Sequence, residues 1–477
     1  MIEMSIADIA SAIGGRFVPA SDVASPDGAA DRVGGVVQTD SREIEPGGIF
    51  FALRGETTDG HLFAPAAVAN GAALLVVERE LDAAVPQVVV DDSLVALSDL
   101  AREVVARVRA GGRLKVLAVT GSNGKTTTKN MLRAILVAEG STGAPLGSCN
   151  NEVGAPVSML GIDHDTRYLG VEMGADGVGD ITKLVSVARP DVGIVLTVGL
   201  AHIGKFGSPD AIEQAKGEMV ADLPETAVAV LNADDPRVAR MAARTRAAVQ
   251  WFGLGEAADV RAEGLEAGAT GTTFTVVADG ERLPARLRIL GEHHVTNALA
   301  AMTAARAVGV PLQRSIAALE QLVRAERWRM EVFERPDGVV IINDAYNASP
   351  DSVAAALKTL AQLTRGGERR SIAVLGEMAE LGGYADDEHD RIGRLAVRLN
   401  VNQLVVVGHN ARHIHNAAGL EGSWDGESVL VETADEAYDF LRDRMREGDV
   451  VLVKSSKSAG LRLLGDRLGS TASEATA

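Results

Sequence analysis

The chain has 477 residues, of which 47 are Lys or Arg and 65 are Asp or Glu, so its formal net charge is −18. This acidic balance, with no basic stripe, disfavours a nucleic-acid partner, and the single cysteine, Cys149, excludes an internal disulfide. The amino terminus lacks the cationic start of a signal peptide and no apolar run is long enough to span a bilayer, so we expect a soluble, cytoplasmic protein that binds no membrane.

The length and the 46% of hydrophobic residues are typical of about three folded domains. We place the first at residues 1–112, the second at 113–327 and the third at 328–477. The first ends in a predicted helix, Leu94–Arg109, and the pair Gly111-Gly112 that follows is a candidate hinge. Many small apolar residues and few aromatic ones favour an α/β fold throughout, because small side chains let helices pack closely on sheets.

The second section begins with an apolar strand pattern, a glycine-containing turn and a helical pattern. Further apolar runs then alternate with helical patterns, which predicts a parallel, doubly wound sheet. The predicted strands are Leu114–Val119, Tyr168–Glu172, Val192–Val198 and Ala227–Leu231, with a helix at Thr126–Ala138 and, at Gly271–Ile289, either a β insertion or an edge of the sheet. The third section repeats this rhythm, with strands at Val339–Asn343, Ser371–Gly376, Gln403–Gly408 and Val450–Val453.

A phosphate-binding loop is the strongest local signal in the chain. The loop comprises Thr120, Gly121, Ser122, Asn123, Gly124, Lys125, Thr126 and Thr127, between the first strand and helix of the second section. Glycines allow a tight turn that aims backbone N–H groups at an anion, and the helix amino terminus adds a partial positive charge. Lys125 can reach the β- and γ-phosphates, and the Thr126 hydroxyl can bind Mg²⁺. Val119 stands where a strict Walker A motif has glycine.

Polar residues at the ends of the predicted strands are candidate metal ligands. Thr126 follows the first strand, Glu172 ends the second, and His202 lies just past the third. Ligands bind beyond the carboxyl ends of strands in open α/β sheets, so these side chains are expected at one edge around a divalent cation. Lys216 and Asn297, in contrast, have the local context of an ordinary helix lysine and of a polar residue at a helix start.

These motifs together resemble the Mur ligase family over nearly the whole chain. The loop is similar to the family's variant of Walker A, and the segment from Asn150 to Pro156 is similar to its second signature. Glu172, His202, Lys216, Asn297 and Arg329 stand in matching contexts. The resemblance implies a uridine-nucleotide-binding α/β domain, a central ATP-binding domain and a Rossmann-like carboxy-terminal domain.

The family likeness also implies an ATP-dependent ligase that activates a carboxylate as an acyl phosphate, which an amine then attacks. Lys125, Glu172, His202 and Lys216 would be catalytic, and Thr126, Glu172, His202 and Lys216 would hold Mg²⁺, expected as two ions. Lys216 would be carbamylated and so become an anionic ligand. Besides the loop, Asn297 would contact adenine, Arg329 the phosphates and Asp344 the ribose.

Within the family, the outer sections resemble the type that joins D-alanyl-D-alanine to UDP-N-acetylmuramoyl-tripeptide, the last cytoplasmic step of a peptidoglycan precursor. The substrate-binding candidates are Ser41, Arg42, Asn150, Asn151, Tyr346 and Asn347, and the loop Glu377–Gly382 is a further position for the dipeptide. A diaminopimelate- or lysine-adding sibling, a folylpolyglutamate synthase and a regulatory ATPase are the alternatives. Whether the tripeptide carries diaminopimelate or lysine stays open, and we expect a monomer.

Overall fold

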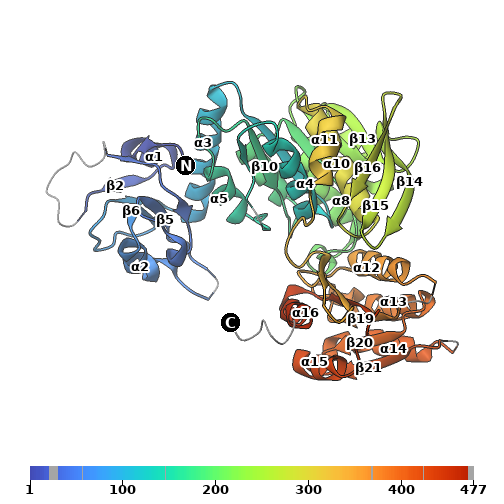
Figure 1. The fold of residues 1–477 in the computed structure, drawn as a ribbon. Coiled ribbons are helices and arrows are strands. Elements are labelled where there is room, and N and C mark those ends of the chain that lie inside the picture. The colour runs from blue at the N-terminus through green and yellow to red at the C-terminus, as the bar shows by residue number, and fades with distance from the viewer. Residues whose placement is uncertain (21–30, 56, 146, 367–368, 423, 471–477) are drawn as a thin grey trace.

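The computed structural model describes residues 1–20, 31–55, 57–145, 147–366, 369–422 and 424–470. Within these ranges the strands form sheets of two, five, nine and six strands. The sheets follow one another along the chain as three α/β units, seen in Figure 1 as blue, green to yellow, and orange to red parts.

The amino-terminal unit is built on a five-stranded sheet in the order β2-β7-β6-β5-β4, with the pair β1-β3 beside it. Its elements are β1 (Met4–Ser5), α1 (Ile6–Ala12), β2 (Arg16–Val18), β3 (Arg32–Val33), β4 (Val37–Gln38), β5 (Gly48–Phe51), α2 (Ala64–Ala69), β6 (Ala72–Val77), β7 (Gln87–Val89) and α3 (Ser93–Ala110). Only β2 runs antiparallel to its neighbour in the five-stranded sheet.

The middle unit has the nine-stranded sheet, ordered β16-β15-β14-β13-β12-β11-β8-β10-β9. Its strands are β8 (Lys115–Thr120), β9 (Thr142–Gly143), β10 (Tyr168–Glu172), β11 (Val192–Val195), β12 (Val228–Asn232), β13 (Ala248–Gly253), β14 (Val260–Gly268), β15 (Gly271–Ala278) and β16 (Glu281–Leu287). Its helices are α4 (Lys125–Val137), α5 (Gly154–Leu160), α6 (Asp180–Ala188), α7 (Ile203–Phe206), α8 (Pro209–Ala221), α9 (Pro236–Arg240), α10 (His293–Ala307) and α11 (Leu312–Glu320). Since β8 pairs in parallel with both β10 and β11, the ends of all three meet at one edge.

The carboxy-terminal unit has six strands in the order β17-β18-β22-β19-β20-β21, parallel apart from β17. Its strands are β17 (Glu331–Glu334), β18 (Val340–Asn343), β19 (Ser371–Leu375), β20 (Gln403–Val407), β21 (Glu427–Val431) and β22 (Val450–Lys454). Its helices are α12 (Pro350–Leu363), α13 (Ala385–Arg398), α14 (Arg412–Leu420), α15 (Ala434–Arg442) and α16 (Leu461–Gly469).

The predicted elements agree closely with those of the structure. The expected α/β class is confirmed, and the segment Gly271–Ile289 is the antiparallel pair β15-β16. One strand is shorter than expected, since β11 ends at Val195 and not at Val198. Beyond it the chain follows the phosphate loop, where the Thr197 carbonyl accepts a hydrogen bond of 2.8 Å from the Ser122 backbone N–H.

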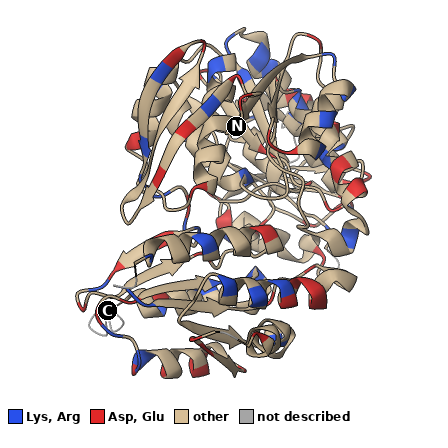
Figure 2. Ribbon diagram, turned by 90° about the vertical axis from the view of Figure 1, so that its right-hand side faces the viewer, with Lys and Arg blue, Asp and Glu red and all other residues tan. Residues whose placement is uncertain are grey.

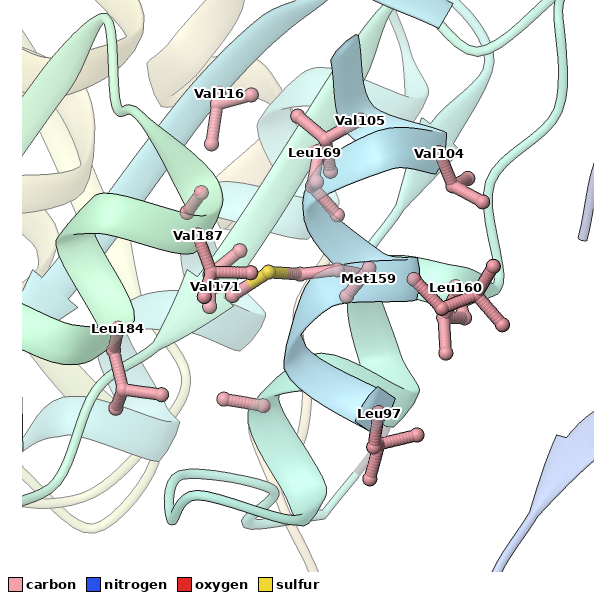
Figure 3. Packing of buried hydrophobic residues seen from close by; sticks show 14 of the residues in the cluster. Leu97, Val104, Val105, Val116, Met159, Leu160, Leu169, Val171, Leu184 and Val187 are labelled. Carbon is pink, nitrogen blue, oxygen red and sulfur yellow. The ribbon is translucent and has the colours of Figure 1, made fainter. Parts of the chain in front are cut away.

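Helix α3 joins the amino-terminal and middle units through one apolar core. Figure 3 shows its Leu97, Val104 and Val105 beside Met159 and Leu160 of α5, Leu169 and Val171 of β10, and Leu184 and Val187 of α6. The same core continues into the amino-terminal sheet through Ile49, Phe51 and Leu74. The boundary at residue 112 stays a prediction, and α3 packs on both sides of it.

The surface carries both signs of charge. Figure 2 shows Lys and Arg interspersed with Asp and Glu along the helices of the face it presents. Within the described ranges, no helix combines the length and the apolar character needed to cross a membrane.

Candidate active site

A large cleft, with a volume of about 1640 Å³, is lined by the middle and carboxy-terminal units and by the amino-terminal part of α3. The predicted site residues that line it are Ser122, Asn123, Gly124, Lys125, Thr126, Thr127, Asn150, Asn151, Glu172, His202, Lys216, Asn297, Arg329, Asp344, Tyr346 and Asn347. The carboxyl edge of the nine-stranded sheet and the carboxy-terminal unit therefore share one cavity.

The phosphate loop has the backbone that its glycines predict. Gly121 and Gly124 have φ of +150° and +83°, and a Cβ on Gly121 would lie 2.9 Å from the Leu196 Cβ. Gly124 precedes the first turn of α4, a helix of 13 residues whose first residues, Lys125 to Thr127, line the cleft. Lys125 Nζ donates a 2.8 Å hydrogen bond to the Gly121 carbonyl. Burial lowers the pKa of Lys125, while Glu172 opposes that shift.

Glu172 ends β10 with a nearly buried carboxylate that is only half satisfied. Its Oε1 accepts hydrogen bonds from Asn150 Nδ2 at 2.8 Å and from Ser148 Oγ at 3.0 Å. Its Oε2 is buried and has no hydrogen-bond partner in the described structure. A buried carboxylate oxygen without a partner costs free energy, and a cation in the cleft would remove that cost.

His202 occupies the turn before α7 with a left-handed φ of +61°. Its Nδ1 contacts the carboxylate of Glu380, which comes from the carboxy-terminal unit. Lys205 Nζ lies 3.0 Å from Glu380 and 2.9 Å from Asp176. Burial, followed by the positive charge of Lys125, lowers the pKa of His202 below its ordinary value. The imidazole is therefore largely neutral at pH 7, the form that can bind a metal.

Lys216 is a buried lysine on α8 whose side chain reaches the cleft. Only 3% of its surface is exposed, and its Nζ lies 5.6 Å from the centre of the Phe206 ring. Burial, and to a lesser extent the positive charge of Lys125, lowers the pKa of Lys216 to about 7. Much of this amine is therefore uncharged at neutral pH, unlike that of a surface lysine.

The donors around the cleft fit a magnesium ion that shares its coordination with phosphate. Among the residues that the structure describes, no three His, Cys, Asp or Glu side chains form a ready-made metal group. The available protein ligands are Glu172 Oε2, the neutral His202 ring and the Thr126 hydroxyl. These are too few to surround a cation completely. Mg²⁺ usually keeps waters and binds through one or two protein ligands plus substrate phosphates, so this incomplete set suits it.

Asn297 lies against the phosphate loop from helix α10. A Cβ on Gly124 would come within 2.4 Å of Asn297 Oδ1, so the glycine permits this close approach. Asn297 Nδ2 is 3.2 Å from His294 Nδ1, and His294 Nε2 is buried without a hydrogen-bond partner among the described residues. Burial holds the pKa of His294 well below its usual value, so the ring is neutral. This wall offers uncharged hydrogen-bonding groups, as a nucleobase requires.

Arg329 and Asp344 reach the cleft from the carboxy-terminal unit. Arg329 Nη2 donates to Thr126 Oγ1 at 3.1 Å, and its guanidinium stacks over the Tyr346 ring at 4.4 Å. The Asp344 carboxylate lies 2.6 Å from Nζ of the buried Lys454. Lys454 ends β22 and carried no motif, so sequence reasoning missed it.

The structure does not bring every predicted residue to the cleft. Ser41 and Arg42 lie in the amino-terminal unit outside its lining, and Arg42 pairs with Asp40 at 2.6 Å while 86% of its side chain is exposed. Their role in binding the uridine nucleotide stays a prediction. Asn151 lines the cleft, but its Oδ1 also accepts the Gly154 N–H at the start of α5. Glu380 was inside a segment expected to hold the dipeptide, and its contact with His202 had no signal in the sequence.

Family models match most of the chain. They are the Mur ligase family catalytic domain at residues 35–110, the Mur ligase middle domain at 119–305 and the Mur ligase glutamate ligase domain at 328–457. The chain is 43% identical to a UDP-N-acetylmuramoyl-tripeptide–D-alanyl-D-alanine ligase from Mycobacterium bovis over 98% of both chains. It is 33% identical to the ligase of that name from Escherichia coli, over 89% of this chain and 91% of the relative.

Solved structures agree with this relationship. A crystal structure of MurF from Acinetobacter baumannii has a TM-score of 0.86 and 31% identity, covering 98% of this chain and 99% of its own. MurF ligase from Thermotoga maritima in complex with ADP has a TM-score of 0.79 and 29% identity, covering 91% and 97%. The matched domains, the full-length identity and the shared three-unit fold lead to one conclusion: the chain belongs to the Mur ligase family.

Proposed function

We propose that this ATP-dependent ligase joins D-alanyl-D-alanine to UDP-N-acetylmuramoyl-tripeptide, in the cytoplasm, and so completes a peptidoglycan precursor. The observation that carries the proposal is that the phosphate loop, Glu172, Arg329 and Asp344 of two different units line the same cleft. The names of full-length relatives at 43% and 33% identity support this choice of substrates.

The first step activates the terminal carboxylate of the tripeptide. A carboxylate oxygen attacks the γ-phosphorus of ATP, the bond to the ADP oxygen breaks, and an acyl phosphate forms. Two anions must meet in an acidic protein, so Lys125 and Arg329 would offset their repulsion beside the backbone N–H groups of the loop. The neutral wall at Asn297 would bind adenine, and Asp344 would bind the ribose.

The second step forms the amide bond. The free amine of the dipeptide attacks the acyl carbon, phosphate leaves with the bonding electrons, and the nitrogen loses a proton to solvent or phosphate. Tyr346 and Asn347 line the cleft where the dipeptide would lie. Exclusion of water by the two facing units protects the acyl phosphate from hydrolysis.

Mg²⁺, when bound, neutralises phosphate charge. Thr126, Glu172 and His202 are the residues that would hold it, with Lys216 as a fourth ligand after carbamylation. A carbamate forms when an uncharged amine adds to CO₂ and releases one proton, which converts a cation into an anion. The burial of Lys216 beside Lys125 favours this conversion, because an unmodified ammonium group there would be repelled.

A coupled assay tests the proposed reaction. We expect phosphate release only when ATP, Mg²⁺, UDP-N-acetylmuramoyl-tripeptide and D-alanyl-D-alanine are all present, with a mass gain of the nucleotide product equal to the dipeptide less water. A parallel assay with UDP-N-acetylmuramoyl-dipeptide and diaminopimelate tests for the activity of the diaminopimelate-adding sibling. Equal phosphate release without any acceptor would identify an ATPase instead.

The carbamate has its own test. Purified protein equilibrated with ¹³C-labelled bicarbonate is expected to show a carbamate ¹³C signal that is absent from Lys216→Ala. Lys183→Ala, which removes an exposed lysine of the same cleft, is the control and should keep the signal. A signal that persists in Lys216→Ala would contradict the assignment.

A further inference from the structure

The segment around α7 meets the carboxy-terminal unit at one compact contact. His202 Nδ1 contacts the Glu380 carboxylate, and Lys205 bridges Glu380 and Asp176 at 3.0 Å and 2.9 Å. His202 belongs to the middle unit and lines the cleft, while Glu380 follows β19 in the carboxy-terminal unit. A candidate metal ligand therefore has its hydrogen-bond partner in a different unit.

The backbones of the two units also approach closely at this contact. The Gly204 N–H donates a 2.8 Å hydrogen bond to the Glu380 carbonyl. A Cβ on Gly204 would lie 2.8 Å from both the Glu380 carbonyl oxygen and the Gly382 nitrogen. Such distances are too short for any side chain, so this approach requires glycine.

Two strained residues face each other across the contact. His202 and Glu380 are non-glycine residues with positive φ, of +61° and +62°. Left-handed backbone at such residues persists only where the surroundings hold it, and it gathers at functional positions. The surroundings here are apolar, because Ile203 and Leu381 are buried at 0% and 2% exposure in one shared core.

The Glu380 carboxylate is placed as an acceptor between two nitrogen groups of the middle unit. Its Oε2 contacts His202 Nδ1, and its Oε1 lies 3.0 Å from Lys205 Nζ. An ionised carboxylate can only accept a hydrogen bond. The proton of a neutral His202 ring then resides on Nδ1, and the lone pair is on Nε2.

We propose that Glu380 is a positioning residue that holds the Nδ1–H tautomer of His202 and directs its Nε2 toward the divalent cation in the cleft. Docking of the carboxy-terminal unit would thereby complete the metal site as well as deliver Arg329 and Asp344. Carboxylates that orient metal-binding histidines change metal affinity by about 10- to 100-fold when removed. The inference rests on the proposed function, since it assigns the cation of that reaction to His202.

The test compares Mn²⁺ binding, measured by electron paramagnetic resonance on the full chain without turnover. Glu380→Ala is expected to bind Mn²⁺ at least tenfold more weakly than the wild type. Glu380→Gln keeps the shape of the side chain but removes its charge, and should fall between the two. Gly204→Ala keeps Glu380 and should weaken Mn²⁺ binding by displacing its backbone.

The matched control is Asp386→Asn, which removes another carboxylate facing a histidine in the carboxy-terminal unit. Asp386 lies 3.4 Å from His413 Nε2, away from the cleft lining, so Mn²⁺ affinity should not change. Circular dichroism establishes that each variant is folded. In addition, ¹⁵N shifts of the His202 ring should report the Nδ1–H tautomer in the wild type and a mixture in Glu380→Ala.

Wild-type Mn²⁺ affinity in both folded Glu380 variants, with an unchanged His202 tautomer, would overturn this inference and leave the ligase reaction intact. A wild-type protein that fails the coupled assay would instead remove the proposed function. The two failures are distinguishable because Mn²⁺ binding needs neither peptide substrate.

Discussion

The middle unit meets its two neighbours through interfaces that differ in their balance of apolar and polar contacts. Toward the amino terminus, α3 buries Leu97, Val104 and Val105 in a core that runs through both units. Toward the carboxyl terminus, several of the cleft contacts are polar: Ser349 with Asn123 at 2.8 Å, Arg329 with Thr126, and Glu380 with His202.

This difference indicates where the molecule can open. Separating an apolar interface exposes hydrophobic surface at roughly 25 cal/mol per Å², whereas polar pairs can exchange their partners for water at little net cost. We therefore expect domain motion in the reaction mainly between the middle and carboxy-terminal units. The smaller apolar cluster around Ile203 and Leu381 would set how readily that interface parts.

The largest expected effect comes from the apolar interface. Leu97→Ala removes a fully buried side chain of α3 and should lower the free energy of unfolding by about 2–5 kcal/mol. Urea unfolding followed by circular dichroism measures this loss. Val95→Ala on the same helix, where 55% of the residue is exposed, should change stability by less than about 0.5 kcal/mol. Equal effects of the two would show that α3 is not a shared core element.

Lys125→Ala should affect the reaction rather than the fold. The loss of a cation beside the developing phosphate charge is expected to reduce kcat by roughly 100- to 1,000-fold. Steady-state phosphate release measures it, with unfolding as the check on stability. Lys115→Ala, at the exposed start of β8, is the control and should keep kcat. Near-normal turnover by Lys125→Ala would contradict the role of the loop.

Arg329→Lys tests the polar interface with the smallest change. Lysine keeps the positive charge but lacks the planar guanidinium group that donates to Thr126 and stacks on Tyr346. We therefore expect kcat/KM to fall about tenfold. Arg327→Lys, whose side chain pairs with Asp466 instead, should alter kcat/KM far less. If both variants behave alike, the contact with Thr126 has no part in catalysis.

Local patterns predicted the elements of the middle and carboxy-terminal sheets well. Strand β8, the loop and α4 follow from an apolar run, two glycines and a helical period, all of which are short-range signals. Strands β14 and β21, whose burial is mixed, were not among the predicted elements. In such strands the alternation of buried and exposed residues is weak, and pairing with neighbouring strands decides the structure.

The residues of the candidate site also fall into two groups, those that local patterns predicted and those that only the structure revealed. Thr126, Glu172 and His202 were predicted at one sheet edge because parallel strands end together, and the structure places all three in the cleft. Glu380 and Lys454 lie 178 and 110 residues from the partners that they contact, His202 and Asp344, so no local pattern could reveal them.

The sequence by itself determined the phosphate loop, the α/β class and the family likeness, because these depend on spacing within a few residues. Only the tertiary structure decided that Lys216 is a buried amine of lowered pKa, and that His202 finds its acceptor in another unit. Burial and partnership across units arise when distant segments pack together, and the protonation states of these side chains follow from that packing.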